Sequence, residues 1–177
     1  MKYIYIITTW FLLTGASCKK STTQEDQLPP ITQTGANTFG CLVNGKVYIP
    51  KGYSGTGSPN FRCIYEIISG RPYFYIKTTQ YEEDIPIGSI YIYINDFTSA
   101  KTFFYQDPDM ALNFGWNKYF PNCGAIINDL SIYRSGSVTI HKYDPTNGIF
   151  SGTFNFKIKN NTCDTIRITE GRFDYKL

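Results

Sequence analysis

Apolar and polar residues alternate most regularly in the C-terminal part of the chain, from Ser137 to Leu177. Every second position between 150 and 158 is apolar or glycine, and the positions between them are polar. A period of two is typical of a β-strand with one buried face. The segment 137–143 alternates in the same way, and the run Asp-Pro-Thr-Asn-Gly at 144–148 is typical of a tight turn, because Pro fixes φ and Asn-Gly accepts positive φ. With a last strand at 166–177, the pattern predicts a closing antiparallel meander.

The alternation changes frame within the last strand. Apolar residues fall at even positions up to Ile168 and at odd positions from Phe173 onward. A β-bulge that absorbs one residue would keep both sets on the same face of the sheet. We expect this bulge at Glu170-Gly171, with the glycine at positive φ.

A hairpin is predicted at the start of the folded part. Apolar residues alternate from Phe39 to Val43, Asn44-Gly45 follows, and the chain returns through 46–48. Asn-Gly between apolar runs favours a type I′ turn, in which both central residues need positive φ.

Further strands are predicted in the middle of the chain, although residues 96–123 carry the weakest pattern. These strands lie at 61–68, 73–79, 89–95, 102–105 and 125–133, with turns at 69–72 and 135–136 and loops at 51–60 and 81–88. The strand at 89–95 has isoleucine at its even positions, and Tyr91 and Tyr93 on the opposite face. Bulky residues on both faces indicate a central strand, or one whose tyrosine face is covered or binds a ligand.

Eight to ten strands joined by short turns, with no helical period, predict an all-β fold. We expect an antiparallel β-sandwich, because the longer loops suit connections between two sheets. A calycin-like β-barrel is the alternative.

The amino-acid composition limits the classes of protein to which the chain can belong. The chain has 177 residues, 42% of them apolar and 18% charged, which suits one domain with a hydrophobic core. The formal net charge is +3, and removal of Lys2 with a leader lowers it by one to about +2. The longest basic run is Lys19-Lys20, so the sequence lacks the positive patch of a nucleic-acid-binding protein.

Residues 1–17 resemble a bacterial lipoprotein signal peptide. Lys2 precedes an apolar run that is too short to span a bilayer, and small residues at 15–17 precede Cys18. The resemblance implies that Cys18 is lipidated after cleavage, with palmitate-type chains that hold the protein on a membrane. Cleavage without lipidation, giving a soluble secreted protein, is the alternative.

Residues 18–37 follow this leader and are polar, with Pro29-Pro30 and few large apolar residues. This composition predicts a flexible tether before a single β-domain at 38–177. The alternative is an ordered arm that lies on the sheet.

Four cysteines remain after Cys18: Cys41, Cys63, Cys123 and Cys163. An even number in an exported domain permits two disulfides with three connectivities. Cys41 and Cys63 alternate with large apolar residues and fit either a buried pair or two inert thiols. No metal site or cofactor is expected, because the chain has no C-x-x-C motif and one histidine.

Candidate catalytic groups are few. The single histidine, His141, lies within a predicted strand and lacks a G-x-S-x-G partner motif, so we expect no catalytic triad. Paired carboxylates could hydrolyse glycosides without histidine. The candidates are Glu66, Asp96, Asp129 and Glu170.

Two segments, 38–50 and 149–174, carry a resemblance to a protein family. The first reads T-F-G-C-L-V-N-G-K-V-Y-I-P, and the second contains I-F-S-G-T-F-N-F and I-T-E-G-R-F-D. They resemble small Bacteroidota-type lipoproteins with a β-rich domain of unknown function. The resemblance implies a body tethered to the outer membrane, on its periplasmic or cell-surface side, and supplies no catalytic residues.

These patterns lead us to expect a monomeric, non-enzymatic binding module for a glycan, peptide or protein ligand. Tyr91, Tyr93 and Trp116 are the candidate binding residues, because aromatic side chains give large contact areas at low entropy cost. Core packing is the alternative role for them. A carboxylate-dependent hydrolase of envelope or dietary polymers is the alternative function: converging carboxylates would favour it, and a flat aromatic patch would favour the binder.

Overall fold

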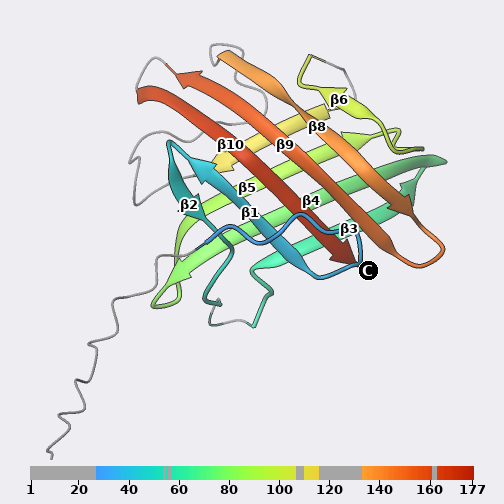
Figure 1. Ribbon diagram of the computed structural model, residues 1–177, viewed down its shortest axis with the longest axis horizontal. Helices are drawn as coiled ribbons and strands as arrows, with labels where there is room; N and C mark the ends of the chain where they lie inside the picture. Colours follow the sequence, from blue (N-terminus) through green and yellow to red (C-terminus); the bar gives the residue numbers. More distant parts are fainter. Residues whose placement is uncertain (1–26, 54, 56, 107–109, 116–132, 161–162) are drawn as a thin grey trace, which may run out of the picture.

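Two antiparallel sheets pack against each other in the computed structural model, which describes residues 27–177 except 54, 56, 107–109, 116–132 and 161–162 (Figure 1). The six-stranded sheet contains, from edge to edge, β2 (Lys46–Tyr48), β1 (Thr38–Val43), β10 (Cys163–Lys176), β9 (Ile149–Asn160), β8 (Tyr133–Asp144) and β6 (Thr102–Phe104). The four-stranded sheet contains β3 (Phe61–Ile68), β4 (Arg71–Glu82), β5 (Ile85–Asn95) and β7 (Met110–Gly115).

This architecture confirms the predicted β-sandwich. Every strand pairing among the described residues stays within one sheet, so the sheets do not close into the calycin-like barrel that the sequence left as the alternative. The last strand β10 lies between β1 and β9, so the first and last strands of the described part are neighbours.

The core lies between the two sheets and is rich in phenylalanine and isoleucine. Phe74 of β4 stacks on Phe150 of β9, with ring centroids 5.3 Å apart. Both side chains are fully buried. Burial of each such side chain contributes about 1.5–3 kcal/mol, so this layer is the main source of stability. At one end, the Tyr65 and Tyr143 hydroxyls of opposite sheets lie 2.8 Å apart.

Glycines on β9 and β10 make room for phenylalanine rings on the neighbouring strand. The predicted bulge is confirmed between Ile168 and Gly171, but the residue at positive φ is Glu170, at 52°. Gly171 is needed for a different reason, because a Cβ at this position would collide with the Phe154 ring. Gly152 has the same relation to Phe173.

The turns confirm some predictions and correct others. Asn44-Gly45 forms the expected turn with φ of 49° and 79°. The predicted loop at 81–88 is wrong, because β4 and β5 extend to a tight turn in which Glu83 and Asp84 have φ of 49° and 64°. The predicted turn at 135–136 is also wrong, because both residues lie inside β8.

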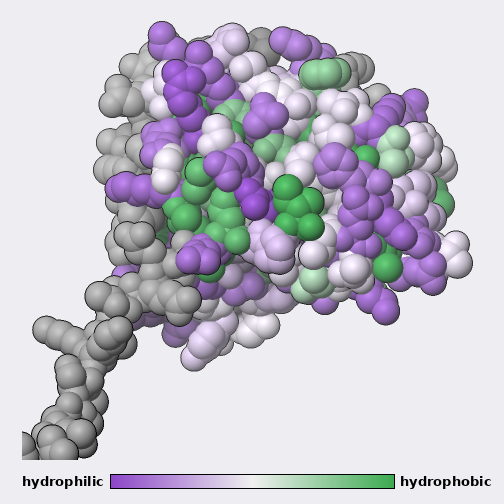
Figure 2. Space-filling view, in the orientation of Figure 1, coloured by the Kyte–Doolittle hydropathy of each residue, from purple (hydrophilic) through white to green (hydrophobic). Residues whose placement is uncertain are grey.

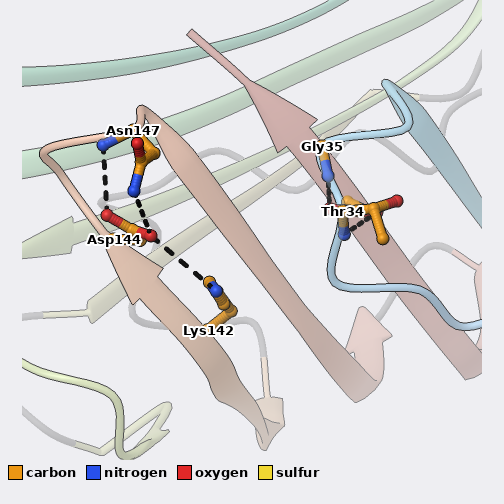
Figure 3. A network of polar contacts seen from close by, with 6 residues as sticks. Thr34, Gly35, Lys142, Asp144 and Asn147 are labelled. Atoms are coloured by element: carbon orange, nitrogen blue, oxygen red, sulfur yellow. Dashed lines mark hydrogen bonds and ion pairs between the residues drawn. The ribbon is translucent and has the colours of Figure 1, made fainter.

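The turn at 144–148 is held by one carboxylate. Asp144 accepts hydrogen bonds from the backbone N–H of Asn147 at 3.1 Å and from its side-chain amide at 2.9 Å. The ammonium of Lys142 lies 3.7 Å away (Figure 3). These hydrogen bonds lower the pKa of Asp144, with Lys142 adding to the effect.

Residues 27–37, which we call the arm, lie on the outer face of the six-stranded sheet. Figure 1 shows the arm in blue, running over this sheet toward the C-terminus. Its Pro29 covers Gly40 of β1, where a Cβ would lie 2.6 Å from the proline ring. At its other end, Asn37 accepts a hydrogen bond from the backbone N–H of Lys176 at 2.9 Å. The flexible tether therefore does not describe residues 27–37, which form the ordered arm that the sequence offered as the alternative.

The arm is held by the buried carboxylate of Asp174, which is 0% exposed. The backbone N–H groups of Thr34, Gly35 and Ala36 donate to it at 2.9, 2.8 and 3.1 Å, and the Thr32 hydroxyl donates at 2.7 Å. Thr34 and Gly35 are labelled in Figure 3. Burial raises the pKa of Asp174, but the hydrogen bonds from Thr32, Thr34, Ala36 and Gly35 together hold it below its ordinary value.

Candidate functional site

Four tyrosines share the outer face of the four-stranded sheet. Along β4, the buried Phe74 and Ile76 alternate with outward-facing Tyr73, Tyr75 and Lys77. Along β5, three fully buried isoleucines alternate with Tyr91 and Tyr93. Because successive side chains of a β-strand point to opposite faces, the phenylalanine and isoleucine side chains face the core and the tyrosines face outward. We call Tyr73, Tyr75, Tyr91 and Tyr93 the tyrosine face.

The strand register brings these rings into contact. Tyr75 lies opposite Tyr93, and their ring centroids are 4.5 Å apart with an interplanar angle of 18°. Tyr91 lies 6.2 Å from Tyr75 at an angle of 6°, and Tyr73 lies 6.3 Å from Tyr93. All four side chains are half-buried. The rings therefore form one packed row across two strands.

The Tyr73 and Tyr75 hydroxyls in this row stay protonated at neutral pH. Burial raises the pKa of Tyr73 to about 12, with further contributions from Tyr93 and Glu66. Burial and the neighbouring Tyr93 also raise the pKa of Tyr75. Protonated phenols are hydrogen-bond donors as well as acceptors, so the face can contact a polar ligand.

Two cations adjoin the tyrosine face. Arg62 of β3 lies directly opposite Lys77 of β4, and the Lys77 ammonium lies 5.9 Å from the centroid of the Tyr91 ring. No carboxylate of the described residues pairs with either cation. We call Arg62 and Lys77 the cation pair. Like charges directly opposite each other in a sheet are destabilising, so this placement has a cost.

The structure brings together two of the three predicted binding residues. Tyr91 and Tyr93 belong to the same face, whereas Trp116 lies outside the described residues. Sequence reasoning missed Tyr73 and Tyr75 as members of the face. Their alternation with Phe74 and Ile76 was visible, but the pairing of Tyr75 with Tyr93 depends on the β4–β5 register.

Among the described residues, the candidate carboxylates Glu66 and Glu170 lie on different sheets. Glu66 lies on the outer face of the four-stranded sheet, whereas Glu170 belongs to β10 and pairs with Arg172 at 3.2 Å. Asp96 pairs with Arg71 at 3.6 Å, and Asp129 lies outside the described residues. The described part of the chain therefore does not place Glu66 and Glu170 at one site for hydrolysis.

His141 and the cysteines occupy ordinary structural positions. His141 is exposed, and its Nε2 lies 2.9 Å from the Thr153 hydroxyl. Cys41 and Cys63 are buried free thiols whose pKa values are raised by burial, so they fit the interpretation of inert thiols. The side chains of Cys123 and Cys163 lie outside the described part. Within that part, no three His, Cys, Asp or Glu side chains gather closely enough to hold a metal ion.

Two hollows lie away from the tyrosine face. One, of about 250 Å³, lies where the arm meets β1 and the loop before β3, lined by Pro29, Phe39 and Phe61 among others. The other, of about 420 Å³, is open to solvent beside the β10 bulge and includes Ile31, Thr153 and Arg172. Neither hollow includes a paired set of carboxylates or a residue of the tyrosine face.

Comparisons with protein families, with curated proteins and with solved structures give no match. In the described residues, no helix has the length and apolar character needed to cross a bilayer.

Proposed function

We propose that the chain is a lipid-anchored binding protein of the cell envelope, held on the outer membrane through Cys18, and that its tyrosine face contacts the ligand. The observation that carries the binding role is the packed row of four tyrosines on an outer sheet face. The sequence around Cys18 supports the anchor.

A binding role fits the chemistry of this surface better than hydrolysis. Tyrosines supply apolar contact area and hydroxyls at a small entropy cost, as binding surfaces require. A carboxylate-dependent hydrolase would need two acidic groups on opposite sides of one scissile bond. Glu66 and Glu170, which lie on different sheets, do not supply that pair.

The anchor is tested by expressing the full chain and a Cys18→Ala variant in a Bacteroidota host. We expect the wild-type protein in the membrane fraction and the variant in the soluble fraction or unprocessed. Protease treatment of whole cells then reports the membrane face. A soluble wild-type protein would contradict lipid anchoring through Cys18. The binding role has a separate test.

The binding role is tested with the full chain on an array of neutral and acidic polysaccharides. Tyr91→Ser combined with Tyr93→Ser should weaken binding at least tenfold, because it removes half of the row. Tyr133→Ser is the matched control, since Tyr133 is 56% exposed and lies on the six-stranded sheet. Equal losses in both variants, or no loss in either, would contradict a binding role for the tyrosine face.

A further inference from the structure

We infer that the ligand of the tyrosine face is an anionic polysaccharide, whose acidic groups pair with Arg62 and Lys77 while its sugar rings lie along the tyrosines. This inference rests on the proposed binding function and adds the chemical class of the ligand.

The first argument is that the groups at the Lys77 end of the face suit a negatively charged ligand, whereas Glu66 lies opposite Tyr73 at the other end. Rings stacked against each other direct their edges toward solvent, and aromatic edges carry partial positive charge. The Tyr73 and Tyr75 hydroxyls keep their protons at neutral pH and can donate hydrogen bonds. Lys77 and Arg62 add two full positive charges beside the row.

The second argument is that the cation pair lacks a neutralising group in the described part of the chain. Arg62 and Lys77 are directly opposite each other, as Arg167 and Lys157 are on the six-stranded sheet, whereas Arg71 and Arg172 lie beside a carboxylate. A bound anion would relieve the repulsion between the two cations and form charge-assisted hydrogen bonds with both.

The third argument concerns the shape of the ligand. The row runs across β4 and β5 with centroid spacings of 4.5–6.3 Å, which presents hydroxyls at repeated intervals on a sheet face. A polymer with a hydroxyl-rich ring in each unit can repeat its contacts along such a row. A peptide commonly pairs with the backbone at a sheet edge instead, and β4 and β5 are both interior strands.

The fourth argument favours a polysaccharide over the lipid surface itself. The arm lies on the six-stranded sheet, although its first described residue, Gln27, lines the hollow that also includes Asn60 and Phe61 before and within β3. Gln27 follows Cys18 by nine positions, a stretch that spans at most about 30 Å when fully extended. The arm and the tyrosine face therefore lie on opposite layers, and a membrane in contact with the arm's layer would leave the tyrosine face open to a polymer.

The experiment compares one polymer in charged and uncharged form. The full chain in detergent micelles is titrated against immobilised polygalacturonate and against the same polymer after reduction of its carboxyl groups. Alginate and chondroitin sulfate serve as further acidic probes. We expect wild-type protein to bind at least one acidic polymer ten times more tightly than the reduced polymer, with affinity falling as salt is added.

The matched variants separate a specific site from general charge. Arg62→Ala with Lys77→Ala should abolish the preference for the acidic polymer. Lys159→Ala with Arg167→Ala removes the same charge from exposed positions of the six-stranded sheet and should change affinity less than twofold. Thermal unfolding of each variant checks that the fold is kept.

Several outcomes would overturn the inference. Equal binding of the charged and reduced polymers would show that the acidic groups of the polymer do not determine affinity. Equal effects of the two double variants would show that the cation pair has no specific role in binding. Failure to bind any of the acidic polymers would exclude this ligand class. Binding to phosphatidylglycerol vesicles that depends on Arg62 and Lys77, without polysaccharide binding, would assign the face to lipid. The proposed function fails separately if substitution of Tyr91 and Tyr93 changes no binding.

Discussion

On the outer face of the six-stranded sheet, the carboxylate of Asp174 is fully buried and receives its hydrogen bonds from the arm. On the outer face of the four-stranded sheet, Arg62 and Lys77 face each other without a carboxylate partner among the described residues. The arm crosses the part of the first face formed by β1 and β10, and Figure 2 shows small hydrophobic areas on this face among hydrophilic residues. The second face carries a row of half-buried tyrosines instead.

This difference shows two ways in which a sheet face can place polar groups. A buried charge is costly unless hydrogen bonds compensate for its lost hydration, and the chain supplies those bonds to Asp174 itself. The cation pair stays hydrated, so the folded protein tolerates it without an internal partner. We interpret the first arrangement as serving stability and the second as serving recognition.

Of the substitutions that test this difference between the two faces, Asp174→Ala should cause the largest loss of stability. The substitution leaves three backbone N–H groups and the hydroxyls of Thr32 and Thr34 without their acceptor, so we expect the free energy of unfolding to fall by about 3 kcal/mol. Chemical denaturation measures this change, and hydrogen exchange at Thr34, Gly35 and Ala36 should speed up with it. Asp144→Ala is the control, because Asp144 holds only a local turn. Similar losses in the two variants would mean that the arm contributes little to stability.

A smaller loss of stability is expected when the pH is lowered. The pKa of Asp174 lies below its ordinary value of 3.8 in the folded protein, so the unfolded chain binds this proton more readily. The stabilisation is fully present above about pH 4 and is lost as the pH falls through the lowered pKa. Denaturation of wild type and Asp174→Asn across this range should give curves that converge at low pH. A constant separation between them would show that the ionised carboxylate is not what holds the arm.

The smallest effect on stability is expected on the tyrosine face. Cross-strand aromatic pairs contribute about 0.2–1 kcal/mol, so Tyr93→Ser should lower the free energy of unfolding by roughly 1 kcal/mol or less. Denaturant titration measures this loss against that of Asp174→Ala. A loss near 3 kcal/mol would indicate that the tyrosines are packing residues, which would weaken the binding interpretation.

Local sequence signals predicted much of the fold. The alternation gave strands such as β5 and β9, the Asn44-Gly45 pair gave a hairpin, and the frame change located the bulge before Gly171. Each of these features depends on residues close together in the chain. The pattern could not show that Gly171 is required by a neighbouring ring, because that ring comes from Phe154 on another strand.

The arm and the full tyrosine face needed the three-dimensional structure. Thr32 and Asp174 are 142 positions apart, so the polar composition around Thr32 looked like that of a tether. The acceptor of the hydrogen bonds that order this segment, Asp174, lies near the C-terminus. Likewise, Tyr91 and Tyr93 were visible as one face of a strand, but Tyr75 joins them only through the pairing of β4 with β5.

The most direct test of the account is hydroxyl-radical footprinting of the full chain with and without polygalacturonate, or whichever acidic polymer of the set it binds. The account predicts that Tyr75, Tyr91 and Tyr93 are protected from oxidation when the polymer is bound. Tyr133 and Ile31, which lie with the six-stranded sheet, should be oxidised equally in both samples. Protection of Tyr133 and Ile31 in place of the tyrosine face would contradict the assignment of recognition to the four-stranded sheet.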